Sequence, residues 1–246
     1  MNNGIIAPGP VLAAVLLALV VVAAVVMWLG RIGQWHAAVT ASARAIAQLG
    51  VVSLLIAAVL QSMWLTALFI VVMFGVAAAT SARRVGELRD CAWTSAALGA
   101  GVVPVLAMLV GSRLIPVAPI ALVPIAGILI GGAMTATSLT GRRALEVLKT
   151  RHGEYEAARA LGFGQRDAVL LICRPSAGDA LLPALDQTRT VGLVTLPGAF
   201  VGVLLGGATP LQAGATQVLV LIALLAVEAV AALVVVELVA AGRLKP

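Results

Sequence analysis

The stretch PVLAAVLLALVVVAAVVMWL, residues 10–29, contains no charged side chain. A helix needs about 20 apolar residues to cross the hydrocarbon core of a bilayer, so this stretch is long enough to cross once. No Lys or Arg precedes it, and no small-residue cleavage site follows Trp28, Leu29 and Gly30. We therefore expect a retained first transmembrane helix and not a secretory signal.

Six more apolar runs follow the first, at 44–60, 63–80, 92–110, 119–139, 187–205 and 214–240. Hydrophobic residues make up 62% of the chain and charged residues 11%, whereas a soluble domain carries about 25% charged residues. The sequence therefore predicts an all-α polytopic membrane protein with about seven transmembrane helices. A single transmembrane domain is expected over residues 1–246.

The basic residues, which give a net charge of +6, lie in the gaps between the apolar runs. Placing the N-terminus outside puts Arg31, the cluster at 83–89, the polar segment 141–186 and the C-terminus in the cytoplasm, and leaves only Arg113 outside. This asymmetry is the positive-inside pattern and predicts a multi-pass protein of the inner (plasma) membrane. No basic stripe is interleaved with aromatic residues, so lipid and not nucleic acid is the expected partner.

The long polar segment contains EYEAARALGFGQRDAVLLICRP at 154–175. Small alanines allow a partner surface to approach closely, and the two glycines can end one helix and allow a turn before the next. The stretch resembles the EAA loop of ABC permeases, although Arg174 stands where that loop usually has leucine. The resemblance implies that a cytoplasmic coupling-helix loop, about 141–186, docks a separate ATPase through Glu156, Ala157, Ala158, Gly162 and Gly164.

Almost the whole chain is also similar to one permease family, the FetB-like iron-export permeases with their plant aluminium-tolerance relatives. The matching stretches are RAIAQL at 44–49, VPIAG at 123–127, TVGLVTLPG at 190–198 and the block 206–217. The resemblance implies the membrane-spanning permease subunit of an ABC transporter that exports a metal ion such as iron or a related small solute.

The chain departs from this family's pattern at three places. The family has G-N-A-M where this chain has GGAM at 131–134, so Gly132 replaces an asparagine. Thr209 stands in place of an aspartate before Pro210, and Ala199 and Phe200 replace a pair of methionines. Because each change removes a candidate ligand, the sequence predicts no definite metal site.

Polar residues and a Pro-Gly pair interrupt the apolar runs, and they indicate a translocation pathway. Glu228 lies in the middle of the last run, where a charged side chain costs about 2.5–3.5 kcal/mol on insertion scales. The alternative is structural: an interhelical hydrogen bond for the polar side chains and packing for the small residues and Met134. The candidate pathway residues are Gln48, Met134, Thr190, Thr195, Pro197, Gly198, Gln217 and Glu228.

The chain has no G-x-x-x-x-G-K-[ST] phosphate-binding loop, so ATP and Mg²⁺ are expected on a partner ATPase and not on this subunit. We accordingly expect a transport protein and not an enzyme, together with a second copy of the permease. An ATPase-independent secondary transporter or channel is the alternative, and it would be expected to show inverted repeats or several intramembrane charges. A membrane enzyme would need a cluster of catalytic groups, and the chain has only two histidines and no HExxH motif.

Overall fold

Two apolar helices come first in the computed structural model, which describes residues 9–245. Helix α1 (Pro10–Leu29) coincides with the first predicted span, and α2 (Trp35–Gln61) starts well before the second. The chain divides between Val59 and Leu60 into two units, and the first unit holds α1 and most of α2. The predicted second span, 44–60, therefore covers only the later part of α2, because the helix already begins at Trp35.

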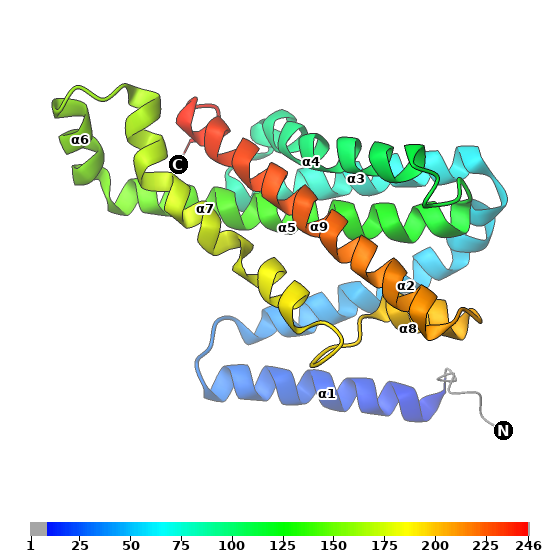
Figure 1. The fold of residues 1–246 in the computed structure, drawn as a ribbon. Helices are drawn as coiled ribbons and strands as arrows, with labels where there is room; N and C mark the ends of the chain where they lie inside the picture. Colours follow the sequence, from blue (N-terminus) through cyan, green and yellow to red (C-terminus); the bar gives the residue numbers. More distant parts are fainter. Residues whose placement is uncertain (1–8, 246) are drawn as a thin grey trace. The chain divides into compact units, whose positions relative to one another are not determined.

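The second unit contains the remaining helices (Figure 1). They are α3 (Met63–Val85), a short 3₁₀ turn η1 (Leu88–Asp90), α4 (Cys91–Gly111), α5 (Pro119–Thr150), α6 (His152–Ala160), α7 (Gln165–Thr190), α8 (Gly198–Leu205) and α9 (Pro210–Ala240). Within residues 9–245, the only β-type pairing is an isolated bridge between Val191 and Thr195. The all-α fold class is confirmed.

Seven helices of the described chain are long and apolar enough to cross a membrane. They are α1, α2, α3, α4 with its preceding 3₁₀ turn, α5, α7 and α9. The predicted number of spans is confirmed, but the sixth was predicted in the wrong place.

The predicted sixth span, 187–205, is not one helix. The chain leaves α7 after Thr190 and turns at 191–197, where Gly192 has φ +83° and its N–H donates to the Thr195 carbonyl at 2.8 Å. Pro197 then caps α8, which is only eight residues long. A positive φ at glycine and a proline without an N–H interrupt the helix here, although hydropathy alone does not reveal the break.

The polar segment 141–186 contains the predicted helix, turn and second helix, but the second helix, α7, continues far beyond the expected docking stretch to Thr190. The segment is helical except for the short links between α5, α6 and α7. Its charged residues lie on exposed faces, whereas Ala144, Val169, Ile172 and Cys173 are buried. The apolar residues of these faces were too widely spaced to stand out as a run, although they recur at helical spacing.

Two core clusters run through the second unit, and α9 contributes to both. One cluster contains Leu98, Leu129 and Val227, and the other contains Leu145, Val169, Val235 and Leu244. The second cluster joins the C-terminal parts of α3, α5 and α9 to the N-terminal part of α7. Most charged residues of the unit gather at this end because these termini meet there.

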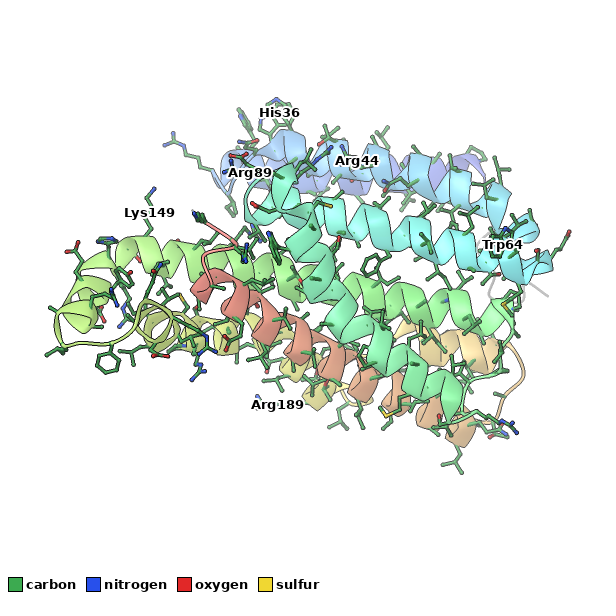
Figure 2. All side chains as sticks on the ribbon, turned by 90° about the horizontal axis from the view of Figure 1, so that it is seen from above. His36, Arg44, Trp64, Arg89, Lys149 and Arg189 are labelled. Atoms are coloured by element: carbon green, nitrogen blue, oxygen red, sulfur yellow. The ribbon has the colours of Figure 1, made fainter. Side chains whose placement is uncertain are left out.

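The two ends of the second unit therefore differ in polarity. In Figure 2, Lys149 and Arg89 lie toward one end, whereas Trp64 lies at the other. Arg113 follows α4 at the end opposite the charged one, next to the buried Ile115. A concentration of basic residues at one end is the arrangement expected of a helical bundle that spans a bilayer.

We predict that Gly153 and Ala208 lie on opposite sides of the membrane. Each would be replaced by cysteine in a variant lacking the native Cys91 and Cys173, and labelled with an impermeant maleimide in intact cells and in inverted vesicles. A side chain at Gly153 meets nothing within 4 Å, so the label should not disturb the fold. Labelling of both positions from the same side would contradict the corrected arrangement of α7, α8 and α9.

Candidate functional site

A cavity of about 250 Å³ lies between α5, α7 and α9. Glu228 of α9, Gln187 of α7 and Thr135 of α5 are among the side chains that line it. The remaining wall is made of small and apolar residues: Gly131, Gly132, Ala136, Leu139, Ala180, Pro183, Ala184 and Leu224. A few polar groups in an otherwise apolar hollow are typical of a small-ligand site.

Glycines determine how closely α9 approaches its neighbours. A Cβ at Gly132 would lie 2.2 Å from Leu224 Cδ1 and 2.7 Å from Glu228 Oε1. A Cβ at Gly101 of α4 would lie 2.6 Å from the Val227 carbonyl oxygen. The Gly101 contact is with backbone and leaves no room for a side chain, so it brings α9 close to α4 at the level of Glu228. The Gly132 contacts are with the ends of two flexible side chains, so Gly132 gives the carboxylate room beside α5.

Glu228 stands well inside its helix, since α9 runs from Pro210 to Ala240. Its side chain is half-buried. Among the residues that the structure describes, no hydrogen bond or ion pair is made by its carboxylate. The Glu228 carboxylate therefore faces the cavity and is not held in a hydrogen bond or ion pair with the described residues.

The other predicted pathway residues of the second unit do not converge on this cavity. Met134 packs its side chain against the first core cluster, and its carbonyl oxygen accepts hydrogen bonds from Ser81 and Ser138 of α3 and α5 at 3.3 and 2.7 Å. Gln217 is buried, and its Oε1 atom lacks a partner among the described residues. Gln48 is exposed on α2 in the first unit.

Thr190, Thr195, Pro197 and Gly198 all lie in or beside the break between α7 and α8. The Thr190 hydroxyl donates to the Asp186 carbonyl at 2.8 Å, so it is used within its own helix. Gln187, one turn earlier, lines the cavity. The motif that was predicted as a pathway element therefore sits directly after the cavity-lining part of α7.

The predicted docking segment forms a helix-turn-helix, α6 and α7, at the charged end of the unit (Figure 1). Gly162 has φ +92°, which only glycine adopts readily, and Gly164 precedes the first residue of α7. The expected end of one helix and restart of the next at these glycines is confirmed. Arg159 Nη1 donates to the Phe163 carbonyl at 2.7 Å and holds the turn.

The five predicted docking residues are not equally accessible. Glu156, Ala157, Gly162 and Gly164 are exposed, whereas Ala158 is buried. Ala158 therefore packs the helix-turn-helix internally and does not present itself to a partner. Two exposed apolar side chains that the sequence reading missed, Leu161 and Phe163, flank Gly162 on the turn.

Salt bridges stiffen α6 at its start. Arg151 Nε donates to Glu154 Oε1 at 2.6 Å, and a second nitrogen of Arg151 contacts Oε2. The guanidinium lowers the pKa of the Glu154 carboxyl below its usual value. His152 and Glu156 stand one turn apart, with Nδ1 and Oε1 3.5 Å from each other.

A second acidic residue of α9, Glu237, connects this segment to the bundle. Arg166 Nη2 lies 2.7 Å from Glu237 Oε2, and Arg174 Nη2 lies 3.8 Å from Oε1. Arg174 is the residue that departs from the usual leucine of the EAA loop. The departure is explained by Glu237, which gives the arginine a partner.

Comparison with known proteins supplies the family. The family described as "Uncharacterised protein family (UPF0014)" matches residues 11–242. The chain belongs to this family. Together with the seven candidate spans, this makes it an all-α, multi-pass UPF0014 membrane protein.

Three UPF0014 relatives indicate what the family includes. The chain is 35% identical to the UPF0014 membrane protein STAR2 of Oryza sativa subsp. japonica over 209 residues, 83% of this chain and 73% of the relative. It is 36% identical to Protein ALUMINUM SENSITIVE 3 of Arabidopsis thaliana over 154 residues, 63% and 56% of the two chains. It is 34% identical to the "Probable iron export permease protein FetB" of Escherichia coli (strain K12) over 128 residues, 52% and 49%. No solved structure matches the chain.

Replacing Gly132 by alanine should destabilise the bundle by about 1 kcal/mol, because the added methyl group must displace the ends of the Leu224 and Glu228 side chains. Gly131→Ala is the matched control, since a Cβ there meets nothing within 4 Å and alanine favours a helix by up to about 1 kcal/mol. Unfolding in a mild detergent, followed by circular dichroism, measures both. Equal stability of the two variants would mean that α5 and α9 are not in contact at Gly132.

Proposed function

We propose that this protein is the membrane-spanning permease subunit of an ABC transporter, driven by a separate ATPase that carries ATP and Mg²⁺, and that it exports a metal ion such as iron or a related small solute. The observation that carries the proposal is the α6–α7 turn. It is a rigid, exposed helix-turn-helix at the basic end of the unit, and it coincides with the EAA-like stretch.

The turn has the physical properties that a docking element needs. Leu161 and Phe163 offer exposed apolar surface on either side of Gly162, and a partner that covers them removes this surface from water. The ion pairs of Glu237 with Arg166 and Arg174 tie the start of α7 to α9. A push on the turn would therefore be transmitted to helices that line the cavity.

The proposed orientation follows the positive charge. The basic end of the second unit, with the α6–α7 turn and the C-terminus, lies on the cytoplasmic side of the inner membrane, and the N-terminus lies outside. A cytoplasmic turn is accessible to a soluble ATPase. A second copy of the permease completes the transporter, because such ATPases act in pairs on two membrane subunits.

A secondary transporter that needs no ATPase is the second candidate. The observation in its favour is the break between α7 and α8 at 191–197, since interrupted helices near a midplane binding site are typical of that class. The two candidates differ in whether ATP hydrolysis by a bound partner drives transport, and the following experiment separates them.

Gly162→Val should abolish recruitment of the ATPase or lower transport-coupled ATP hydrolysis about tenfold or more. A β-branched residue at φ +92° is strained by roughly 1–2 kcal/mol or more, so the turn changes shape. Gly162→Asn is the matched control because asparagine tolerates a positive φ, and it should retain most of the coupling.

The measurement is co-purification with candidate ABC ATPases from the same organism, followed by ATP hydrolysis in proteoliposomes. A folded Gly162→Val variant that recruits the ATPase and couples at the normal rate would rule out this turn as the coupling element. Transport that proceeds without any ATPase would instead favour the secondary transporter.

A further inference from the structure

We propose that the cavity between α5, α7 and α9 is a binding site for a hard cation, with the Glu228 carboxylate as its charged ligand and oxygen atoms of Thr135 and Gln187 as neutral ligands. The site itself is argued from the cavity alone. The role of the ion as transported cargo rests on the proposed permease function.

The donor set indicates the class of ion. All the side-chain donors that suit a cation and line the cavity are oxygens: a carboxylate, an amide and a hydroxyl. The cavity lining includes no His, Cys or Met side chain. Oxygen ligands favour hard ions such as Mg²⁺, Mn²⁺ or Ca²⁺, whereas imidazole and sulfur favour softer ones.

The carboxylate is available for such an ion. It lies inside a transmembrane helix and has no hydrogen-bond or ion-pair partner in the described chain. Nearby, the Thr135 hydroxyl donates to the Gly131 carbonyl at 3.0 Å, which orients its lone pairs without using them. An acidic group held in a membrane without a counter-charge is stabilised when a cation arrives.

The small number of ligands in the proposed site favours transient binding of the cation over permanent retention. Among the described residues, no group of three or more His, Cys, Asp or Glu side chains could hold a metal ion. An ion in a cavity of about 250 Å³ would therefore keep part of its water shell. Moderate affinity for a partly hydrated ion suits an ion that must also leave the site.

Gly132 adds an independent argument. The family pattern has asparagine at this position, and a Cβ built at Gly132 would lie 2.7 Å from Glu228 Oε1. The carboxylate of α9 thus occupies the space into which an asparagine side chain of α5 would project. In this chain the α5 position carries no side chain, and the Glu228 carboxylate lies in that space.

The test is Mn²⁺ binding to the purified permease in nanodiscs, without ATPase, followed by the loss of the free-ion signal in electron paramagnetic resonance. Wild type should bind one Mn²⁺ per chain. Glu228→Gln should weaken binding about tenfold or more, because a charge-assisted ligand is lost. Thr135→Val and Gln187→Leu should each weaken it several-fold.

Glu237→Gln is the matched control, because it removes a carboxylate from the same helix that is already paired with Arg166. It should bind Mn²⁺ as wild type does. The proposal is wrong if wild type has no saturable site, or if Glu228→Gln binds as tightly as wild type. If Glu228→Gln does not fold, wild-type affinity in both Thr135→Val and Gln187→Leu would overturn it.

The exchange between the two helices gives a second test. Gly132→Asn alone should lower stability and weaken Mn²⁺ binding about tenfold, because the new side chain competes with the carboxylate for one space. Adding Glu228→Ala to Gly132→Asn should restore stability but not the affinity, since the restored polar group is neutral. Full Mn²⁺ affinity in the single Gly132→Asn variant would show that the carboxylate is not the ligand.

The proposed function can fail separately from the site. Binding to the permease alone, with no recruitment of an ATPase, would leave the cation site intact and remove the ABC mechanism. ATP-driven transport of another solute, with no saturable Mn²⁺ binding, would support the ABC mechanism and rule out the cation site.

Discussion

The close approach of α9 to α4 and α5 is the contact on which the rest of the second unit depends. Gly101 leaves no room for a Cβ against the Val227 backbone, and a Cβ at Gly132 would displace the ends of the Leu224 and Glu228 side chains. In a bilayer, helices gain little from hiding apolar surface from one another, so dense packing of this kind carries much of their association. Both core clusters include residues of α9. The cavity lies where Glu228 of α9 meets the glycine face of α5.

Helix α7 links the α6–α7 turn to the cavity. Its first residues follow the α6–α7 turn, whereas Ala180, Pro183 and Gln187 line the cavity. Pro175 and Pro183 lie inside the helix, and each removes one backbone hydrogen bond and weakens the helix locally. The proposed docking end and the cavity end are thus carried on one helix that is locally weakened at two prolines, and a movement of one end can change the angle of the other.

The sequence predicted the fold class and the number of spans because twenty-residue apolar runs have few alternatives in a membrane protein. It misplaced the sixth span because a hydropathy window averages over the turn at Gly192 and Pro197. It missed most of α7 because Arg166, Asp167 and Arg174 conceal a buried face at Ala168, Val169 and Ile172. Glu228 was found because an intramembrane acid is conspicuous alone, whereas Thr135 and Gln187 become significant only when three helices bring them to one cavity.

Two departures from family patterns have the same structural explanation. Arg174 replaces a leucine, and Glu237 of α9 lies within ion-pair distance of it. Gly132 replaces an asparagine, and Glu228 of α9 fills the space that this leaves. In each case the change on α5 or α7 is matched by a carboxylate on α9, a helix that otherwise consists almost entirely of apolar residues. Across the helix interface, Arg174 has an ion-pair partner and the Glu228 carboxylate lies in the space beside Gly132. Cation binding at the proposed site is therefore expected to depend on pairs of positions in facing helices and not on any single motif.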